Sequence, residues 1–137
     1  MSELNIEATV ENLPQVLAFV DELLEQHDCS MRTQMQVDVA VEELFVNIAH
    51  YAYQPNTGSA LIRAEILEGD PPTLSVTFID RGMPYDPLAK EDPDVTLAAE
   101  DRQIGGLGIY MVKKSMDDMR YRFEDGQNIL TIEKKLG

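Results

Sequence analysis

The sequence predicts an α+β fold, a two-layer sandwich in which helices pack on one face of a sheet. Two observations support this prediction. Segments with helical spacing of apolar residues and segments with strand-like alternation follow one another in the order β-α-α-β-β-α-β-β. The length of 137 residues, with 44% hydrophobic and 26% charged residues, is enough for one core and close to globular averages. We therefore expect a single domain over residues 1–137.

The first half of the chain predicts one strand and two helices. Apolar and polar residues alternate over residues 4–8, which is typical of a strand. Asn12 can cap a first helix, because Pro14 is tolerated in the first turn. Ser30 is a second candidate N-cap, and its helix is expected to run to about Tyr53, before a turn-forming cluster.

The second half predicts four strands and one helix. Strand-like runs cover residues 60–67 and 73–79, and a helix follows the glycines at 105–108. Two short strands are expected at about 120–124 and 129–134.

Between the third strand and the third helix the regular pattern is lost, and prolines and charged residues take its place. Loops of this length in a compact domain are usually functional and often act as lids. We therefore expect a lid loop at about 85–104.

The balance of charge excludes several classes of partner. Eleven Lys and Arg stand against 25 Asp and Glu, so the formal net charge is −14. Such a field repels phosphate backbones and anionic lipids, which argues against nucleic acid and membrane partners. No Lys or Arg precedes Arg32 and no long apolar run occurs, so neither a signal peptide nor a transmembrane helix is expected. Cys29 is the single cysteine, which predicts no disulfide and fits a cytoplasmic location.

A narrow polar stripe follows the second helix, which is otherwise mostly apolar. Five polar side chains fall within an arc of roughly 60°: Gln36, Glu43, Asn47, His50 and Gln54. The arc is either a solvent-facing edge or the wall of a pocket. In a pocket, the carboxylate of Glu43 can take a proton from a hydroxyl, and the amide oxygen of Asn47 suits Mg²⁺.

Asp80 continues the apolar row of its strand. It lies two residues beyond the alternating apolar positions of 74–78, so it shares their face of the sheet. A carboxylate there is costly unless something donates hydrogen bonds to it. It is either a strand-end residue in solvent or an acceptor for an exocyclic amine such as that of adenine. In the second case Gly82 and Pro84 would bend the chain around the ligand.

Gly106, Leu107 and Gly108 open the third helix. Glycine at a helix start exposes backbone N–H groups at the positive end of the helix dipole, which can bind an anion. The alternative is a simple joint between a loop and a helix. Arg102 lies just upstream, either as a ligand of a terminal phosphate or as a solvated lid residue.

Together, these three elements resemble the nucleotide-binding motifs of the Bergerat-fold (GHKL) superfamily, which has a histidine-kinase-type ATP-binding domain. Within it, the chain is most similar to the small anti-sigma-factor serine kinases of the RsbW/SpoIIAB type. The similarity spans nearly the whole chain, including its tail over 116–132, and rests on three segments: Val41–Tyr53, Ile79–Pro87 and Gly105–Lys113.

The resemblance implies a mixed, mostly antiparallel sheet with three helices on one face, and ATP bound between the helices, the sheet end and the lid. The family's motifs assign these roles: Asn47 would hold Mg²⁺, Glu43 would be the base, Asp80 would read adenine with Gly82 beside it, Gly106, Leu107 and Gly108 would line the phosphates, and Arg102 would lie in the lid.

Two further positions, His50 and Pro84, are expected to contact the nucleotide. In addition, one of two adjacent acids has to be chosen as the base. His50 lies on the same polar arc as Asn47. Pro84 stands where the family usually has a second glycine, which is a departure from its pattern. Glu42 offers a second carboxylate beside Glu43, but it lies off the arc, so Glu43 is the predicted base.

The function that the resemblance implies is Mg²⁺·ATP-dependent phosphorylation of a serine or threonine on a partner protein. The substrate would be a small anti-sigma-factor antagonist of the STAS type, and a sigma factor would be a second partner, with the chain acting as an anti-sigma factor and regulatory kinase. A homodimer is expected. Two alternatives stay open: a non-catalytic ATP-binding switch module that docks partner proteins, and a plain ATPase.

Overall fold

The computed structural model describes residues 2–27, 29–53, 55–89 and 106–136. Among these residues, none of the helices combines the length and the apolar character needed to cross a bilayer. The main elements in chain order are β1 (Ser2–Glu7), α1 (Leu13–Glu25), α2 (Met31–Asn47), β2 (Ser59–Leu67), β3 (Thr73–Asp80), α3 (Gly106–Ser115), β4 (Asp118–Glu124) and β5 (Gln127–Lys135).

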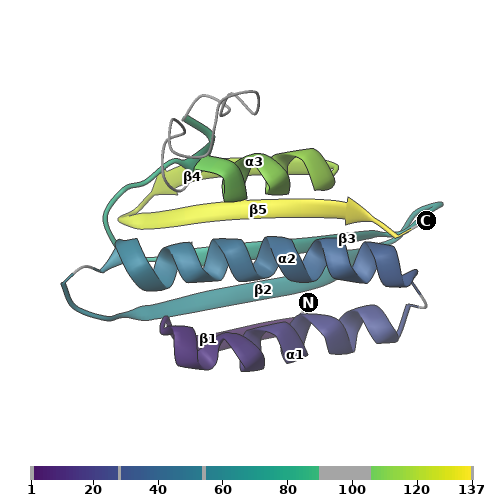
Figure 1. Ribbon diagram of the computed structural model, residues 1–137, viewed down its shortest axis with the longest axis horizontal. Coiled ribbons are helices and arrows are strands. Elements are labelled where there is room, and N and C mark those ends of the chain that lie inside the picture. The colour runs from purple at the N-terminus through teal and green to yellow at the C-terminus, as the bar shows by residue number, and fades with distance from the viewer. Residues whose placement is uncertain (1, 28, 54, 90–105, 137) are drawn as a thin grey trace.

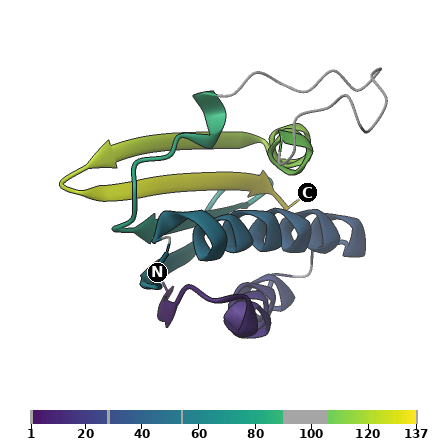
Figure 2. The ribbon, with the colours of Figure 1, turned by 60° about the vertical axis from the view of Figure 1, so that its left-hand side comes forward.

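The five strands form one sheet in the order β1-β2-β3-β5-β4, and all three helices lie on the same face of it (Figure 1). The predicted α+β sandwich is therefore confirmed. Every strand pair is antiparallel, whereas the resemblance implied a mixed sheet. The reason is that α3 leads the chain to the outer strand β4, and a hairpin then returns β5 between β3 and β4. Figure 2 shows the turn of this hairpin projecting away from the helices.

The core lies between the helices and the sheet. Residues at helical spacing on α1 and α2 meet alternate residues of the inner strands, as the amphipathic patterns require. The largest fully buried side chains are Phe45, Phe78, Leu24, Ile62, Leu74, Ile132, Val16, Val20, Val37, Val41, Val76 and Val112. This packing fixes α2 across the middle of the sheet.

The second helix begins and ends in ways that matter for the site. Ser30 caps its start, because the Ser30 hydroxyl accepts a hydrogen bond from the backbone N–H of Thr33 at 3.1 Å. At its end α2 widens into a π-helical turn over Ile48–Ala52, so the predicted run to about Tyr53 is helical nearly throughout. The carbonyl of Ala52 then accepts a hydrogen bond from the N–H of Met83 at 2.8 Å. This bond ties the end of α2 to the loop after β3.

Candidate functional site

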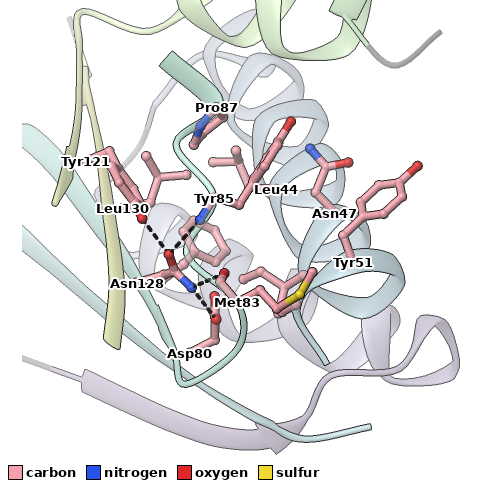
Figure 3. A pocket seen from close by; sticks show the side chains of 13 residues that line it. Leu44, Asn47, Tyr51, Asp80, Met83, Tyr85, Pro87, Tyr121, Asn128 and Leu130 are labelled. Atoms are coloured by element: carbon pink, nitrogen blue, oxygen red, sulfur yellow. Dashed lines mark hydrogen bonds between the residues drawn. The ribbon is translucent and has the colours of Figure 1, made fainter. Parts of the chain in front are cut away.

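A pocket lies where the end of α2, the ends of β3 and β5 and the loop after β3 meet (Figure 3). It holds about 470 Å³ of empty space, part of it open to solvent. Most of its 13 lining residues are apolar or aromatic. The polar groups among them include Asn47, Asp80 and Asn128.

The pocket brings together two side chains that the sequence predicted from separate patterns. Asn47 is the last residue of α2 and is half-buried, and Asp80 ends β3 with 6% of its surface exposed. They lie 33 positions apart in the sequence, yet both line the same cavity. For Asn47 and Asp80 the structure therefore favours a position in a pocket over one on a solvent-facing edge.

Asp80 is held by donors on two sides. Its Oδ1 accepts a hydrogen bond from the N–H of Gly82 at 2.9 Å and another from Nδ2 of Asn128 at 2.9 Å. These bonds supply the donors that a carboxylate on an apolar sheet face requires.

Asn128 is a site residue that the sequence analysis missed. It lies directly opposite Asp80 in the antiparallel pairing of β3 with β5, and it is 6% exposed. Its Nδ2 also donates to the carbonyl of Met83 at 2.9 Å, and its Oδ1 accepts from the N–H of Tyr85 at 3.1 Å and from the hydroxyl of Tyr121 at 2.5 Å. A signal was present: Asn128 shares a strand face with the buried Leu130, as Asp80 does with Phe78.

Gly82 is required by a close approach of two backbone segments. A Cβ at this position would overlap the carbonyl of Ala52, at the end of the π-helical turn. The predicted bend of the chain here is therefore present, and it needs a residue without a side chain. Pro84 is exposed and does not belong to the pocket lining.

Glu43 lies one helical turn before Asn47 and is half-buried between α2 and α3. Its carboxylate lies so close to Gly108 that a Cβ there would overlap it. Burial raises the pKa of Glu43 above its ordinary value, and the negative charge of Glu42 raises it further. A hydrogen bond with Asn47 acts in the opposite direction and lowers the pKa. The result is a carboxylate that holds a proton more readily than an exposed one.

The remaining predicted positions are less closely tied to the pocket. His50 is exposed, does not line the cavity and faces the ring of Tyr51 edge-on, with 5.9 Å between ring centroids. Gly106 and Leu107 form the start of α3, as predicted. Arg102, and the part of the predicted lid from residue 90 onward, lie outside the described residues.

Curated protein kinases are similar to most of the chain. Serine/threonine-protein kinase BtrW of Bordetella bronchiseptica is 24% identical over 129 residues, which cover 94% of this chain and 89% of that protein. Serine-protein kinase RsbW of Bacillus cereus is 27% identical over 96 residues, which cover 67% of this chain and 58% of that protein.

Solved structures share the fold. The crystal structure of the RsbU and RsbW domains of Rv1364c from Mycobacterium tuberculosis matches 99% of this chain and 33% of that one, with a TM-score of 0.67 and 19% identity. The histidine kinase domain of the blue-light activated kinase EL346 from Erythrobacter litoralis matches 92% of this chain and 60% of that one, with a TM-score of 0.53 and 14% identity. A family model for the histidine kinase-like ATPase domain matches residues 6–134, and the chain therefore belongs to this family.

Proposed function

We propose that this protein is a Mg²⁺·ATP-dependent serine/threonine kinase that phosphorylates a partner protein. The observation that carries the proposal is the position of three side chains: Asn47 and Asp80 line one pocket, and Glu43 precedes Asn47 by one helical turn. Membership of an ATPase domain family supports ATP as the phosphoryl donor. The names of the relatives BtrW and RsbW support a serine or threonine acceptor.

In this proposal the pocket binds the adenine base. Asp80 accepts a hydrogen bond from the exocyclic amine, and apolar side chains such as Leu44, Phe78 and Leu130 pack against the ring. The backbone N–H groups at the first turn of α3, from Gly106 to Gly108, face the phosphates at the positive end of the helix dipole. A role for Arg102 stays a prediction from the sequence.

Asn47 fits the role of a Mg²⁺ ligand. Its amide carries a hard oxygen of the kind that Mg²⁺ prefers, and it lines the pocket. The described residues contain no group of three or more His, Cys, Asp or Glu side chains that could hold a metal ion. Phosphate oxygens and water would therefore complete the ligand set, as Mg²⁺ prefers. When bound, the ion supplies neutralisation of phosphate charge.

Glu43 is the proposed general base. Phosphoryl transfer requires a group that orients the attacking hydroxyl and accepts its proton. Because burial raises the pKa of Glu43, it accepts a proton more readily than an exposed glutamate does. Its position between α2 and α3 lies next to the first turn that would face the phosphates.

We further propose a small anti-sigma-factor antagonist of the STAS type as the phosphoacceptor and a sigma factor as a second partner. Support comes from the likeness to RsbW over 67% of this chain. The homodimer and the cytoplasmic location stay predictions from the sequence.

The decisive test compares Glu43→Gln with Glu42→Gln. Both remove one carboxylate from neighbouring positions of α2, but Glu42 is exposed. We expect Glu43→Gln to bind Mg²⁺·ATP like the wild type and to lose phosphotransfer by about 100-fold or more, because general base catalysis contributes about that much. Glu42→Gln should keep most of the transfer rate. The measurement is the intact mass of STAS-type proteins encoded beside this gene after incubation with Mg²⁺·ATP, together with calorimetry of nucleotide binding.

The outcomes separate the three functions that the sequence left open. Phosphorylated partner formed by wild type and Glu42→Gln, but not by Glu43→Gln, supports the kinase. Partner binding that depends on ATP, without any phosphorylated product, would instead support the switch module. Release of inorganic phosphate without a partner would support a plain ATPase.

A further inference from the structure

We propose that Asn128 and Tyr121 are positioning residues that hold Asp80 as a hydrogen-bond acceptor and thereby make the pocket select a 6-amino purine over a 6-oxo purine. The inference rests on the proposed function, since it concerns the base of the bound nucleotide. The contact between Asp80 and the base belongs to that function. The new element is the pair of residues behind Asp80, on β5 and β4.

The orientation of the Asn128 amide is fixed by its surroundings. The N–H of Tyr85 can only donate, and it lies 3.1 Å from Oδ1 of Asn128. The hydroxyl of Tyr121 lies 2.5 Å from the same oxygen. An amide turned by 180° would place its NH₂ group against the N–H of Tyr85, where neither group could accept. Oδ1 therefore faces the two tyrosines and Nδ2 faces the carboxylate.

This orientation determines which groups reach Asp80. One hydrogen on Nδ2 of Asn128 is directed to Oδ1 of Asp80 at 2.9 Å, and the other to the carbonyl of Met83 at 2.9 Å. Oδ1 also accepts from the N–H of Gly82. Among the described residues, both hydrogen bonds to this carboxylate end on Oδ1, which leaves Oδ2 for a ligand in the pocket. Figure 3 shows the bond from Asn128.

The consequence is a difference between purines. An exocyclic amine donates to a carboxylate oxygen, whereas a 6-oxo group presents an acceptor to it, and two facing acceptors are unfavourable. Asp80 can discriminate in this way only while its carboxylate is held in a fixed rotamer with Oδ2 toward the ligand. The Nδ2 hydrogen bond from Asn128 holds that rotamer, and the hydroxyl of Tyr121 gives the Asn128 oxygen a second donor beside the N–H of Tyr85.

The test measures the ratio of dissociation constants for Mg²⁺·ATP and Mg²⁺·ITP by calorimetry on the full chain. Inosine triphosphate differs from ATP in carrying a 6-oxo group. We expect the wild type to prefer ATP by about tenfold or more, the effect of one hydrogen bond to a charged group. Asn128→Asp places an oxygen where the donor was, so the preference should fall by about fivefold or more. Tyr121→Phe should lower it less, since the N–H of Tyr85 remains.

The matched control is Asn5→Asp, the same exchange at an exposed position on β1, which should leave the ratio unchanged. An unaltered ratio in Asn128→Asp would overturn the inference, as would an equal loss of ATP and ITP affinity, which indicates a merely structural role. If Asn128→Asp fails to fold by circular dichroism, Tyr121→Phe decides in the same way. A wild type that binds no adenine nucleotide would instead refute the proposed function, from which this inference starts.

Discussion

At the scale of single residues, the site depends on the absence of a side chain at Gly108. The carboxylate of Glu43 occupies the space that a Cβ of residue 108 would need, so α2 and α3 approach each other closely beside the pocket. Because residue 108 has no Cβ, the proposed base can lie against the first turn of α3.

Replacing Gly108→Ala should therefore displace Glu43. Overpacking of this kind costs about 1–3 kcal/mol of stability, and moving the base by about 1 Å should lower phosphotransfer by about tenfold or more. Thermal unfolding and the intact-mass transfer assay measure the two effects. Ser115→Ala, at the far end of α3, is the control and should leave both nearly unchanged. An unchanged transfer rate in Gly108→Ala would show that the contact does not position the base.

The residues of the pocket were predictable to the extent that one strand or one helix defines them. Asp80 was found because it interrupts an apolar row with period two, and Glu43 and Asn47 because they share one helical arc. Asn128 interrupts its own row in the same way, but its meaning depends on the pairing of β3 with β5. That register is a property of the sheet and cannot be read from one strand.

At the scale of elements, α2 joins the site to the rest of the helical layer. Its far end carries the proposed ligand of Mg²⁺, and its middle packs on α1, where Asp21 and Asp38 form a carboxyl pair. One oxygen of each lies buried without a donor among the described residues. The pKa of Asp38 is raised from 3.8 to about 7, mostly by burial and in addition by a hydrogen bond with Asp21 and by the charge of Asp21. A proton carried by Asp38 would supply a hydrogen-bond donor at this contact.

The stability of the fold should therefore depend on pH. Between pH 3.8 and about 7, the folded state keeps the proton on Asp38, whereas the unfolded chain has already released it. Stability falls as the pH rises through this window, and the loss is complete above about pH 7. We expect urea unfolding between about pH 5 and pH 8 to show a fall about 1–2 kcal/mol larger in the wild type than in Asp38→Asn, after allowance for solvent screening.

The exposed acid Glu25, on α1, provides the control for this measurement. Glu25→Gln should keep the pH dependence of the wild type. Parallel curves for wild type and Asp38→Asn would mean that no proton is shared at the contact of α1 with α2.

The existence of each element was predictable from the sequence, while the local details of their ends were not. The helix from Ser30 was expected to end near Tyr53, and it does so only after a change from α- to π-helical hydrogen bonding at Ile48. That change accompanies the contact of Ala52 with Gly82 and Met83, two residues that lie about 30 positions further along the chain. Tertiary contacts of this kind leave no local pattern.

At the scale of the whole molecule, the net charge of −14 acts on the folded state as self-repulsion. Ion pairs made by Arg63, Arg120 and Arg122 lie on the sheet. The first two helices carry a single Arg, Arg32, and no Lys. The helical layer formed by α1 and α2 is therefore predominantly negative.

Screening by salt should stabilise such a molecule. Raising NaCl from about 0.02 M to about 0.5 M shortens the Debye length several-fold, and we expect the thermal midpoint to rise by about 2–5 °C. The combined variant Glu22→Gln with Glu25→Gln removes two exposed negative charges from α1 and should respond less. A midpoint that falls with salt in the wild type would show that attractive ion pairs outweigh the net repulsion.

The order of elements along the chain was enough to predict a two-layer α+β domain, since helices and strands segregate into two layers when their apolar faces meet. The spatial order of the strands was not predictable in this way. Nothing in the patterns of β4 and β5 states that the later strand takes the inner position beside β3. The pocket depends on this arrangement, because it places Asn128 opposite Asp80.

The bond between Asp80 and Asn128 spans 48 residues of sequence, and Leu130 of the same late strand also lines the cavity. During synthesis, α2 and β3 leave the ribosome well before β5, so a growing chain can bury part of its core while it still lacks one wall of the cavity. If the pocket is the nucleotide site that we propose, such an incomplete chain would not bind nucleotide, because the wall that carries Leu130 and Asn128 is missing. Release of a labelled adenine nucleotide would then report the separation of β5 from the sheet during unfolding.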